Sequence, residues 1–310
     1  MDVCATSMGP EGWKGMLGGL HAEAPAFLHA LGGAYALAAG LAPAELRAQL
    51  RSDPSAAIER LARALGTDVD ADAEELRAGG VRRAVVHGST FPLPGGGTVN
   101  DHVAARAARH PDLIDGWAGV DLRDAAAAVA EIDRCAALGM RGVTVIPFLA
   151  AVDAESAACR AVYEHAAARG LPVWLHCGFH PVGGRAMTTP EQLDRIAAAH
   201  PRLALVAGHG GWPWVGELVA VLMRHPNVYL DTSAHDPARM AAPGSGWEPL
   251  LHGLAGPLRR QVVFGSAALV HGRGWRDFAG GVPALGLPDA LAAAWLYGNA
   301  ARLLDLKGND

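Results

Sequence analysis

Histidine recurs just after short apolar segments of this sequence, where it could do chemistry. His176 and His209 end strongly apolar runs and are followed by small residues that leave room for a ligand. Imidazole acts as a base, an acid or a metal ligand near neutral pH, so we assign catalytic roles to these two. His87, His180 and His235 occupy similar places. We expect those three to contact substrate or to be solvated loop residues.

Further side chains near these segment ends could contact a substrate, namely Cys4, Arg185, Trp212, His271 and Arg273. A guanidinium can hold a carboxylate with two hydrogen bonds, although a loop arginine is more often only solvated. Cys4 could act as a nucleophile, but cysteine is more often a small apolar filler. Trp212 suggests a planar ligand or a cover for the core. Together these residues favour a small acidic or aromatic substrate.

The segments that carry these residues alternate with Ala-rich amphipathic stretches from about residue 81 onward. This alternation predicts parallel strands joined by helices. The eight predicted strands are 1–5, 81–86, 113–120, 142–146, 171–176, 203–207, 228–231 and 262–265. Eight such units predict an α/β fold, a (β/α)8 TIM-like barrel, in which all strands end at one mouth and the site lies there.

Helices are predicted between these strands at 124–138, 154–168, 190–199, 288–297 and 299–306. Gly139 and Gly170 are typical helix stops, and Thr189 before Pro190 is a typical helix start. Residues 7–80 hold several more helical stretches, predicted at 22–41, 43–51, 54–65 and 71–78. We interpret residues 1–310 as one barrel domain with a helical insertion at 7–80, which either covers the mouth as a lid or packs outside the barrel.

Composition excludes several classes of protein. The 310 residues are 51% hydrophobic and 18% charged, with a formal net charge of -5. Such a chain can build a large core, and it lacks the basic patches of a nucleic-acid binder or a polybasic membrane binder. Four cysteines without C-x-x-C spacing and an N-terminus without a basic, apolar leader predict a cytoplasmic protein. The expected partner is a small molecule, and a homodimer remains open.

The sequence resembles the amidohydrolase-2 family of the amidohydrolase superfamily, which includes aminocarboxymuconate-semialdehyde decarboxylase. The resemblance covers about residues 81–306. The ordered segments that carry it are 110–112 (HPD), 116–121 (GWAGVD), 139–143 (GMRGV), 163–164 (YE), 170–176 (GLPVWLH), 200–201 (HP), 208–211 (GHGG), 227–233 (NVYLDTS), 264–266 (FGS) and 299–304 (NAARLL). It implies a barrel enzyme whose metal ligands and acid/base group lie at the strand ends.

The metal ligands that the resemblance implies are mostly replaced. Family members usually carry His-x-His after strand one, His after strand five and Asp after strand eight, with an acid/base His after strand six. Here His176 and His209 remain, but Cys4 and Thr6 replace the first pair and Ala267 replaces the Asp. A catalytic zinc needs about three protein ligands and an open position. We therefore expect no metal cofactor, with a zinc site through Cys4, His176 and His209 as the less favoured alternative.

Three functional hypotheses follow. The leading one is an amidohydrolase-2-like enzyme that has lost the metal and uses histidine acid/base chemistry as a lyase, isomerase, cyclase or hydrolase. The second is a non-catalytic barrel that binds a ligand or a partner protein. The third is an ordinary metal-dependent hydrolase or decarboxylase.

Overall fold

Eight short runs rich in valine, leucine and isoleucine form parallel strands in the computed structural model, which describes residues 1–305. They are hydrogen-bonded in chain order. The strands are β1 (Asp2–Ala5), β2 (Ala84–His87), β3 (Ile114–Gly119), β4 (Gly142–Val145), β5 (Val173–His176), β6 (Leu205–Gly208), β7 (Val228–Asp231) and β8 (Val262–Val263). All eight predicted strands are confirmed, with ends displaced by a few residues.

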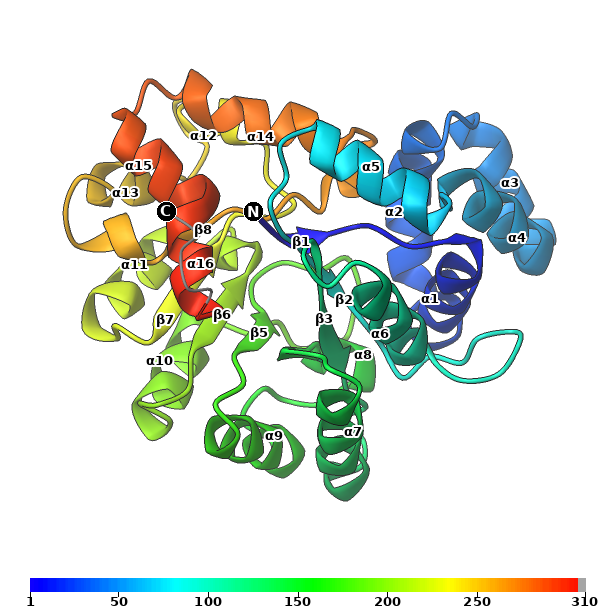
Figure 1. Cartoon of the computed structure of the whole chain (residues 1–310), viewed down its shortest axis with the longest axis horizontal. Coiled ribbons are helices and arrows are strands. Elements are labelled where there is room, and N and C mark those ends of the chain that lie inside the picture. The colour runs from blue at the N-terminus through cyan, green and yellow to red at the C-terminus, as the bar shows by residue number, and fades with distance from the viewer. Residues whose placement is uncertain (306–310) are drawn as a thin grey trace.

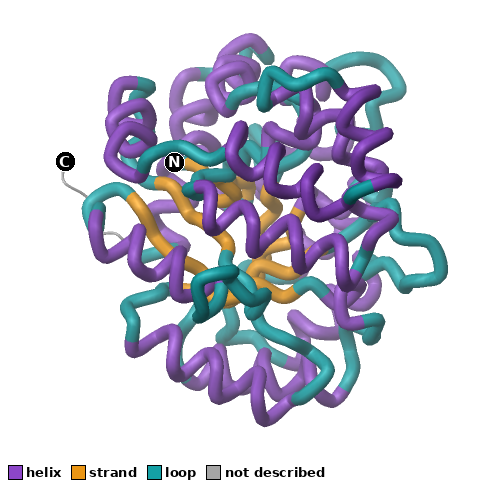
Figure 2. The backbone as a smooth tube through the Cα atoms, turned by 90° about the vertical axis from the view of Figure 1, so that its right-hand side faces the viewer, coloured by secondary structure: helices purple, strands orange, loops and turns teal. Residues whose placement is uncertain are grey.

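The ring of strands closes through backbone hydrogen bonds between its first and last members. Val3 N donates to Phe264 O at 2.9 Å, and Ala267 N donates to Cys4 O at 3.0 Å. Figure 2 shows the strands at the centre of the molecule with helices around them. The structure therefore confirms the predicted TIM-like barrel, and it brings the carboxyl ends of the strands to one mouth.

Helices between the strands cover the outside of the barrel (Figure 1). They are α6 (Val99–Arg109), α7 (Ala125–Ala137), α8 (Pro147–Ala150), α9 (Ala157–Ala168), α10 (Pro190–Ala199), α11 (Val215–Arg224), α12 (Pro237–Met240), α13 (Glu248–Gly253), α14 (Trp275–Ala284), α15 (Asp289–Ala293) and α16 (Asn299–Leu303). Thr189 caps α10 by accepting a hydrogen bond from Gln192 N, as predicted. Gly139 and Gly170 have positive φ just beyond α7 and α9, as helix stops require.

Short single-turn helices complete this layer, namely the 3-10 turns η1 (His209–Gly211), η2 (Pro257–Arg260) and η3 (Ala268–His271) and the π-helical turn η4 (Ala294–Gly298). The predicted helix 288–297 is therefore divided between α15 and η4. The predicted end of the following helix at residue 306 lies outside the described residues.

The insertion between β1 and β2 contains five helices: α1 (Pro10–Glu23), α2 (Pro25–Ala38), α3 (Pro43–Ser52), α4 (Pro54–Leu65) and α5 (Val69–Ala78). The helix predicted at 22–41 is present as α2, with both ends displaced by three residues, whereas α1 was not predicted. The chain leaves the helical region at Ala24, with φ -148° and ψ 63°, because the following Pro25 disfavours helical geometry at the residue before it. Helices α1 to α4 gather at one side of the barrel in Figure 1, and α1 packs against α4.

Candidate active site

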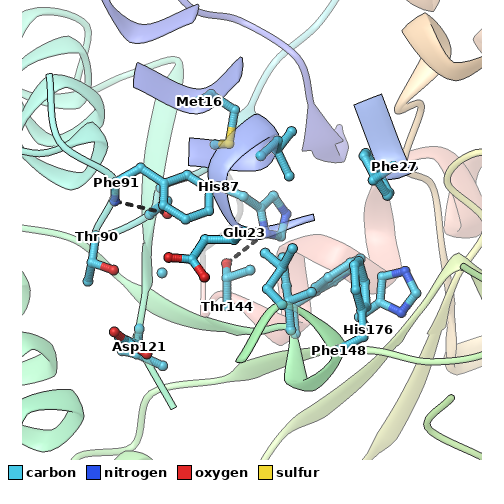
Figure 3. A pocket seen from close by; sticks show the side chains of 18 of the residues that line it. Met16, Glu23, Phe27, His87, Thr90, Phe91, Asp121, Thr144, Phe148 and His176 are labelled. Carbon is cyan, nitrogen blue, oxygen red and sulfur yellow. Dashed lines mark hydrogen bonds between the residues drawn. The ribbon is translucent and has the colours of Figure 1, made fainter. Parts of the chain in front are cut away.

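A cavity of about 220 Å³ lies at the mouth of the barrel. Its floor and sides come from residues that end or follow β1 to β6, and α1 and α2 of the insertion supply the remaining wall. Its lining includes Cys4, Thr6, Trp13, Met16, Glu23, Phe27, Tyr35, His87, Ser89, Thr90, Phe91, Asp121, Arg123, Thr144, Phe148, Trp174, His176 and His209. Figure 3 shows how side chains from the insertion, such as Met16 and Phe27, face those from the barrel.

His209 follows β6 in an unusual backbone conformation. Its φ is 58°, in the left-handed region that costs about 1 kcal/mol for a residue with a Cβ. Gly210 and Gly211 continue this left-handed turn, both with φ of 61°. A Cβ at Gly210 would lie 2.3 Å from the Trp247 ring, so the turn requires glycine there. The His-Gly-Gly sequence thus fixes the backbone position from which the His209 side chain projects.

A hydrogen-bonded chain orients the His209 ring. His209 Nδ1 lies 2.8 Å from Ser233 Oγ, and the same hydroxyl contacts Asp231 Oδ2. With Asp231 ionised, its carboxylate can only accept, so the Ser233 hydroxyl donates to Asp231 and His209 Nδ1 donates to Ser233. His209 Nε2 therefore presents a lone pair to the cavity. Serine and aspartate both come from the end of β7, next to β6 in the barrel.

Asp231 is completely buried. Burial raises the pKa of its carboxyl group. Three donated hydrogen bonds oppose this shift: from Ser233 Oγ, from Ser233 N at 2.9 Å and from Trp174 Nε1 at 2.9 Å. These donors favour the charged carboxylate, which can stabilise a positive charge on the nearby imidazole.

His176 ends β5 and faces His209 across the cavity. Their ring centroids lie 5.0 Å apart in an edge-on arrangement. Within the described residues, neither ring nitrogen of His176 has a protein hydrogen-bond partner, although the side chain is buried. Figure 3 shows the ring beside Phe148, whose centroid is 4.8 Å away. An imidazole with free nitrogens that lines a cavity is available to a ligand.

Both histidines are neutral at pH 7. The position of His209 deep inside the barrel lowers its pKa to about 4. Burial, followed by the neighbouring His209 and His180, lowers the pKa of His176 well below its usual value. The free protein therefore offers two uncharged imidazoles, and His209 is ready to accept a proton.

These shifts predict a stability that depends on pH. Burial lowers the pKa of both His87 and His209 to about 4 from the ordinary value of about 6.5, so between these two pH values the unfolded chain binds more protons. We expect the free energy of unfolding to be highest above pH 6.5 and to fall by about 2 kcal/mol for each histidine between pH 7 and pH 5. Urea unfolding at both pH values measures it, and equal stability would contradict the shifts.

His87 also lines the cavity, but both its ring nitrogens are occupied. Nε2 donates to Val3 O at 2.8 Å, and Nδ1 lies 2.7 Å from Thr144 Oγ1 (Figure 3). His180 lies outside the lining, stacked on Phe148 with ring centroids 4.2 Å apart. Its Nε2 donates to Ala186 O. His87 therefore links β2 to β1 and β4, and His180 holds the loop after β5 together.

The structure does not bring His235, His271 and Arg273 to this cavity. They line a second, separate pocket of about 360 Å³. Arg273 is paired with Asp236 at 2.5 Å, and His271 Nε2 donates to Ala234 O. A left-handed turn at Ala234, with φ of 61°, directs the loop after β7 away from the cavity.

Trp212 and Arg185 also lie outside the lining of the first cavity. Trp212 packs against Phe179 and His235. The Arg185 guanidinium donates to the backbone oxygens of Phe148, Leu149 and Glu23. It therefore ties the insertion to the loops after β4 and β5 and is not free to hold a substrate carboxylate.

Sequence reasoning did not select Ser233 and Asp231, nor the insertion residues that line the cavity. A signal for the first two was present, because residues two apart at a strand end point to the same side. The distant insertion offered no comparable signal.

Comparison with known proteins identifies the family. The sequence model of the Amidohydro_2 (Amidohydrolase) family matches residues 21–306. The chain belongs to the amidohydrolase-2 family. This confirms the resemblance seen in the sequence. None of the curated proteins compared with the chain matches it significantly.

Three solved structures illustrate the similarity of this chain to known barrels. An uncharacterized TIM-barrel protein from Bordetella bronchiseptica is 26% identical, with a TM-score of 0.65, over 85% of this chain and 90% of the other. A 5-carboxyvanillate decarboxylase from Sphingomonas paucimobilis is 18% identical, with a TM-score of 0.60, over 85% and 95%. A 2,6-dihydroxybenzoate decarboxylase from Rhizobium is 18% identical, with a TM-score of 0.58, over 79% and 90%. The last two likenesses establish the fold alone.

The metal that the amidohydrolase-2 resemblance implies does not fit the residues present. Within residues 1–305, no three His, Cys, Asp or Glu side chains are grouped so that they could hold a metal ion. Burial, with the nearby Asp231 and Asp2, raises the pKa of Cys4 well above its usual value, which disfavours the thiolate that zinc would need. Ala267 has no side-chain atom that can bind a metal.

All four cysteines are free thiols. Across the described part of the chain, the helices are too short or too polar to cross a membrane.

Proposed function

We propose that this amidohydrolase-2 chain is an enzyme that moves protons without a metal, with His209 as its base, on a small ring-shaped substrate. The observation that carries the proposal is the chain from His209 Nδ1 through Ser233 to Asp231, which leaves His209 Nε2 as an acceptor toward the cavity. A base oriented by a hydrogen-bonded carboxylate is a recurrent catalytic arrangement.

In this mechanism a substrate O–H or C–H proton passes to His209 Nε2. The resulting imidazolium keeps its Nδ1–H bond to Ser233, and the Asp231 carboxylate beyond it stabilises the positive charge. The base is weak in the empty site, because its pKa is about 4. Negative charge that develops on the substrate raises the pKa of His209, so His209 becomes a stronger base as the proton moves. His176, 5.0 Å away between ring centroids, is placed to donate a hydrogen bond to that negative charge.

A test of this function uses two related rings in D2O. They are 2,6-dihydroxybenzoate and resorcinol, the ring that remains when the carboxyl group leaves. Each exchange replaces one ring hydrogen by deuterium and releases the proton to solvent. We expect NMR to detect exchange of the resorcinol ring hydrogens faster than in protein-free buffer. We expect this exchange to persist in EDTA, because no three candidate metal ligands are grouped within residues 1–305.

The remaining hypotheses give different results in the same experiment. Exchange that stops in EDTA and returns with Zn²⁺ or Mn²⁺ would identify an ordinary metal-dependent enzyme. Binding of either ring without accelerated exchange would identify a non-catalytic ligand-binding barrel.

A further inference from the structure

The lining of the active-site cavity is rich in aromatic side chains. Six Phe, Tyr and Trp side chains surround it together with three histidines; the six are Trp13, Phe27, Tyr35, Phe91, Phe148 and Trp174. Phe27 from α2 and Phe148 after β4 stack with ring centroids 6.0 Å apart, so the insertion and the barrel both contribute. The volume of about 220 Å³ exceeds the roughly 150 Å³ of an apolar cavity that takes up benzene. One substituted ring fits such a space.

Among the described residues that line the cavity, three carry a charged carboxylate or guanidinium group: Glu23, Asp121 and Arg123. Arg123 Nη1 lies 3.0 Å from both oxygens of Glu23, and its Nε and Nη2 each lie 2.8 Å from an oxygen of Asp121. The Arg123 guanidinium thus donates hydrogen bonds to two carboxylates at once. These bonds to Arg123 lower the pKa of Asp121, so it stays ionised and the group carries a net negative charge.

The histidines that face a ligand add no positive charge, since the pKa values of His176 and His209 lie far below neutrality. Arg185 is bound to backbone oxygens outside the lining. A carboxylate placed in this cavity would lose water without gaining a cationic partner, which is strongly unfavourable.

We propose that the cavity selects an uncharged aromatic ring bearing hydroxyl groups, and that the Glu23–Arg123–Asp121 cluster excludes carboxylates. The inference rests on the proposed function in placing the substrate in this cavity. Hydroxyl groups match the polar groups available there, because Ser89, Thr90 and the free nitrogens of His176 can exchange neutral hydrogen bonds with them.

Binding of resorcinol and 2,6-dihydroxybenzoate at pH 7.5, measured by titration calorimetry, tests the inference. The two rings differ only in one carboxylate. We expect resorcinol to bind at least about tenfold more tightly, the effect of one uncompensated charge. Because binding is measured without turnover, a protein that binds resorcinol but exchanges no ring hydrogen would refute the His209 chemistry and leave this inference standing.

The variant Glu23→Gln with Asp121→Asn changes the cluster from net negative to net positive and frees Arg123. We expect its affinity for 2,6-dihydroxybenzoate to rise about tenfold or more, with resorcinol affinity changed only a few-fold. The matched control is Glu155→Gln with Glu191→Gln, because those carboxylates share Arg195 in the same way away from the cavity. Wild-type protein that binds both rings equally, or that binds no resorcinol at millimolar concentration, would overturn the inference. A folded Glu23/Asp121 variant with unchanged preference would overturn it as well.

Discussion

His209→Gln is expected to slow ring hydrogen exchange by about 100-fold or more while the protein still folds and binds resorcinol. Glutamine can keep a hydrogen bond to Ser233, so the Asp231–Ser233 pair retains a partner. The glutamine side chain cannot accept a proton at neutral pH. No imidazolium then forms for Ser233 and Asp231 to stabilise. Exchange rates by NMR and affinity by calorimetry separate these effects.

The control for this variant is His225→Gln. His225 is also hydrogen-bonded to a carboxylate, with Nε2 2.7 Å from Asp194 Oδ1, but it lies at the end of α11 and does not line the cavity. Its replacement should leave exchange within a few-fold of the wild-type rate. Exchange retained to the same extent in His209→Gln would remove His209 from the mechanism.

The barrel and the positions of its two central histidines could be predicted from the sequence, because local sequence patterns are sufficient to identify strands and helices. Alternating apolar runs and Ala-rich helices specify eight units, and parallel strands must end at one mouth. His176 and His209 lie at strand ends and therefore meet. Small residues after each, such as Gly210, reflect the space and backbone geometry that the turn needs.

The partners of the loop residues could not be predicted in the same way. Arg185 and Arg273 lie in loops whose course depends on contacts with distant segments, and each found an acceptor in another loop. His235 follows β7 by only four residues, yet one left-handed residue, Ala234, sends it to the second pocket. The placement of the insertion is still harder to predict, because the sequence within α1 and α2 does not indicate which barrel residues these helices will face.

Restoring the ligands that the family usually carries tests whether the residues at positions 4, 6 and 267 are what disfavours a metal ion at the strand ends. Cys4 and Thr6 line the cavity with His176, and the hydrogen bond from Ala267 N to Cys4 O places Ala267 beside β1. Ala267 has a φ of 39°, a left-handed conformation that aspartate adopts more readily than most residues. The backbone at Ala267 therefore suits the aspartate that the family usually carries, and positions 4 and 6 already line the cavity with His176.

The triple variant Cys4→His, Thr6→His and Ala267→Asp is expected to bind about one zinc ion per chain, since four ligands then surround one point. Zinc at about 100 times its dissociation constant should stabilise the folded state by about 3 kcal/mol, whereas wild-type protein should not respond. Adding His176→Gln to the triple variant removes one ligand and should weaken the effect. Hydrogen bonds that orient metal ligands usually contribute 10- to 100-fold to affinity, so binding weaker by that factor would still agree with this prediction. If the folded triple variant shows no change in melting temperature at millimolar zinc, the strand ends are not equivalent to those of metal-binding family members. The proposed histidine chemistry would then rest on the Asp231–Ser233–His209 chain alone.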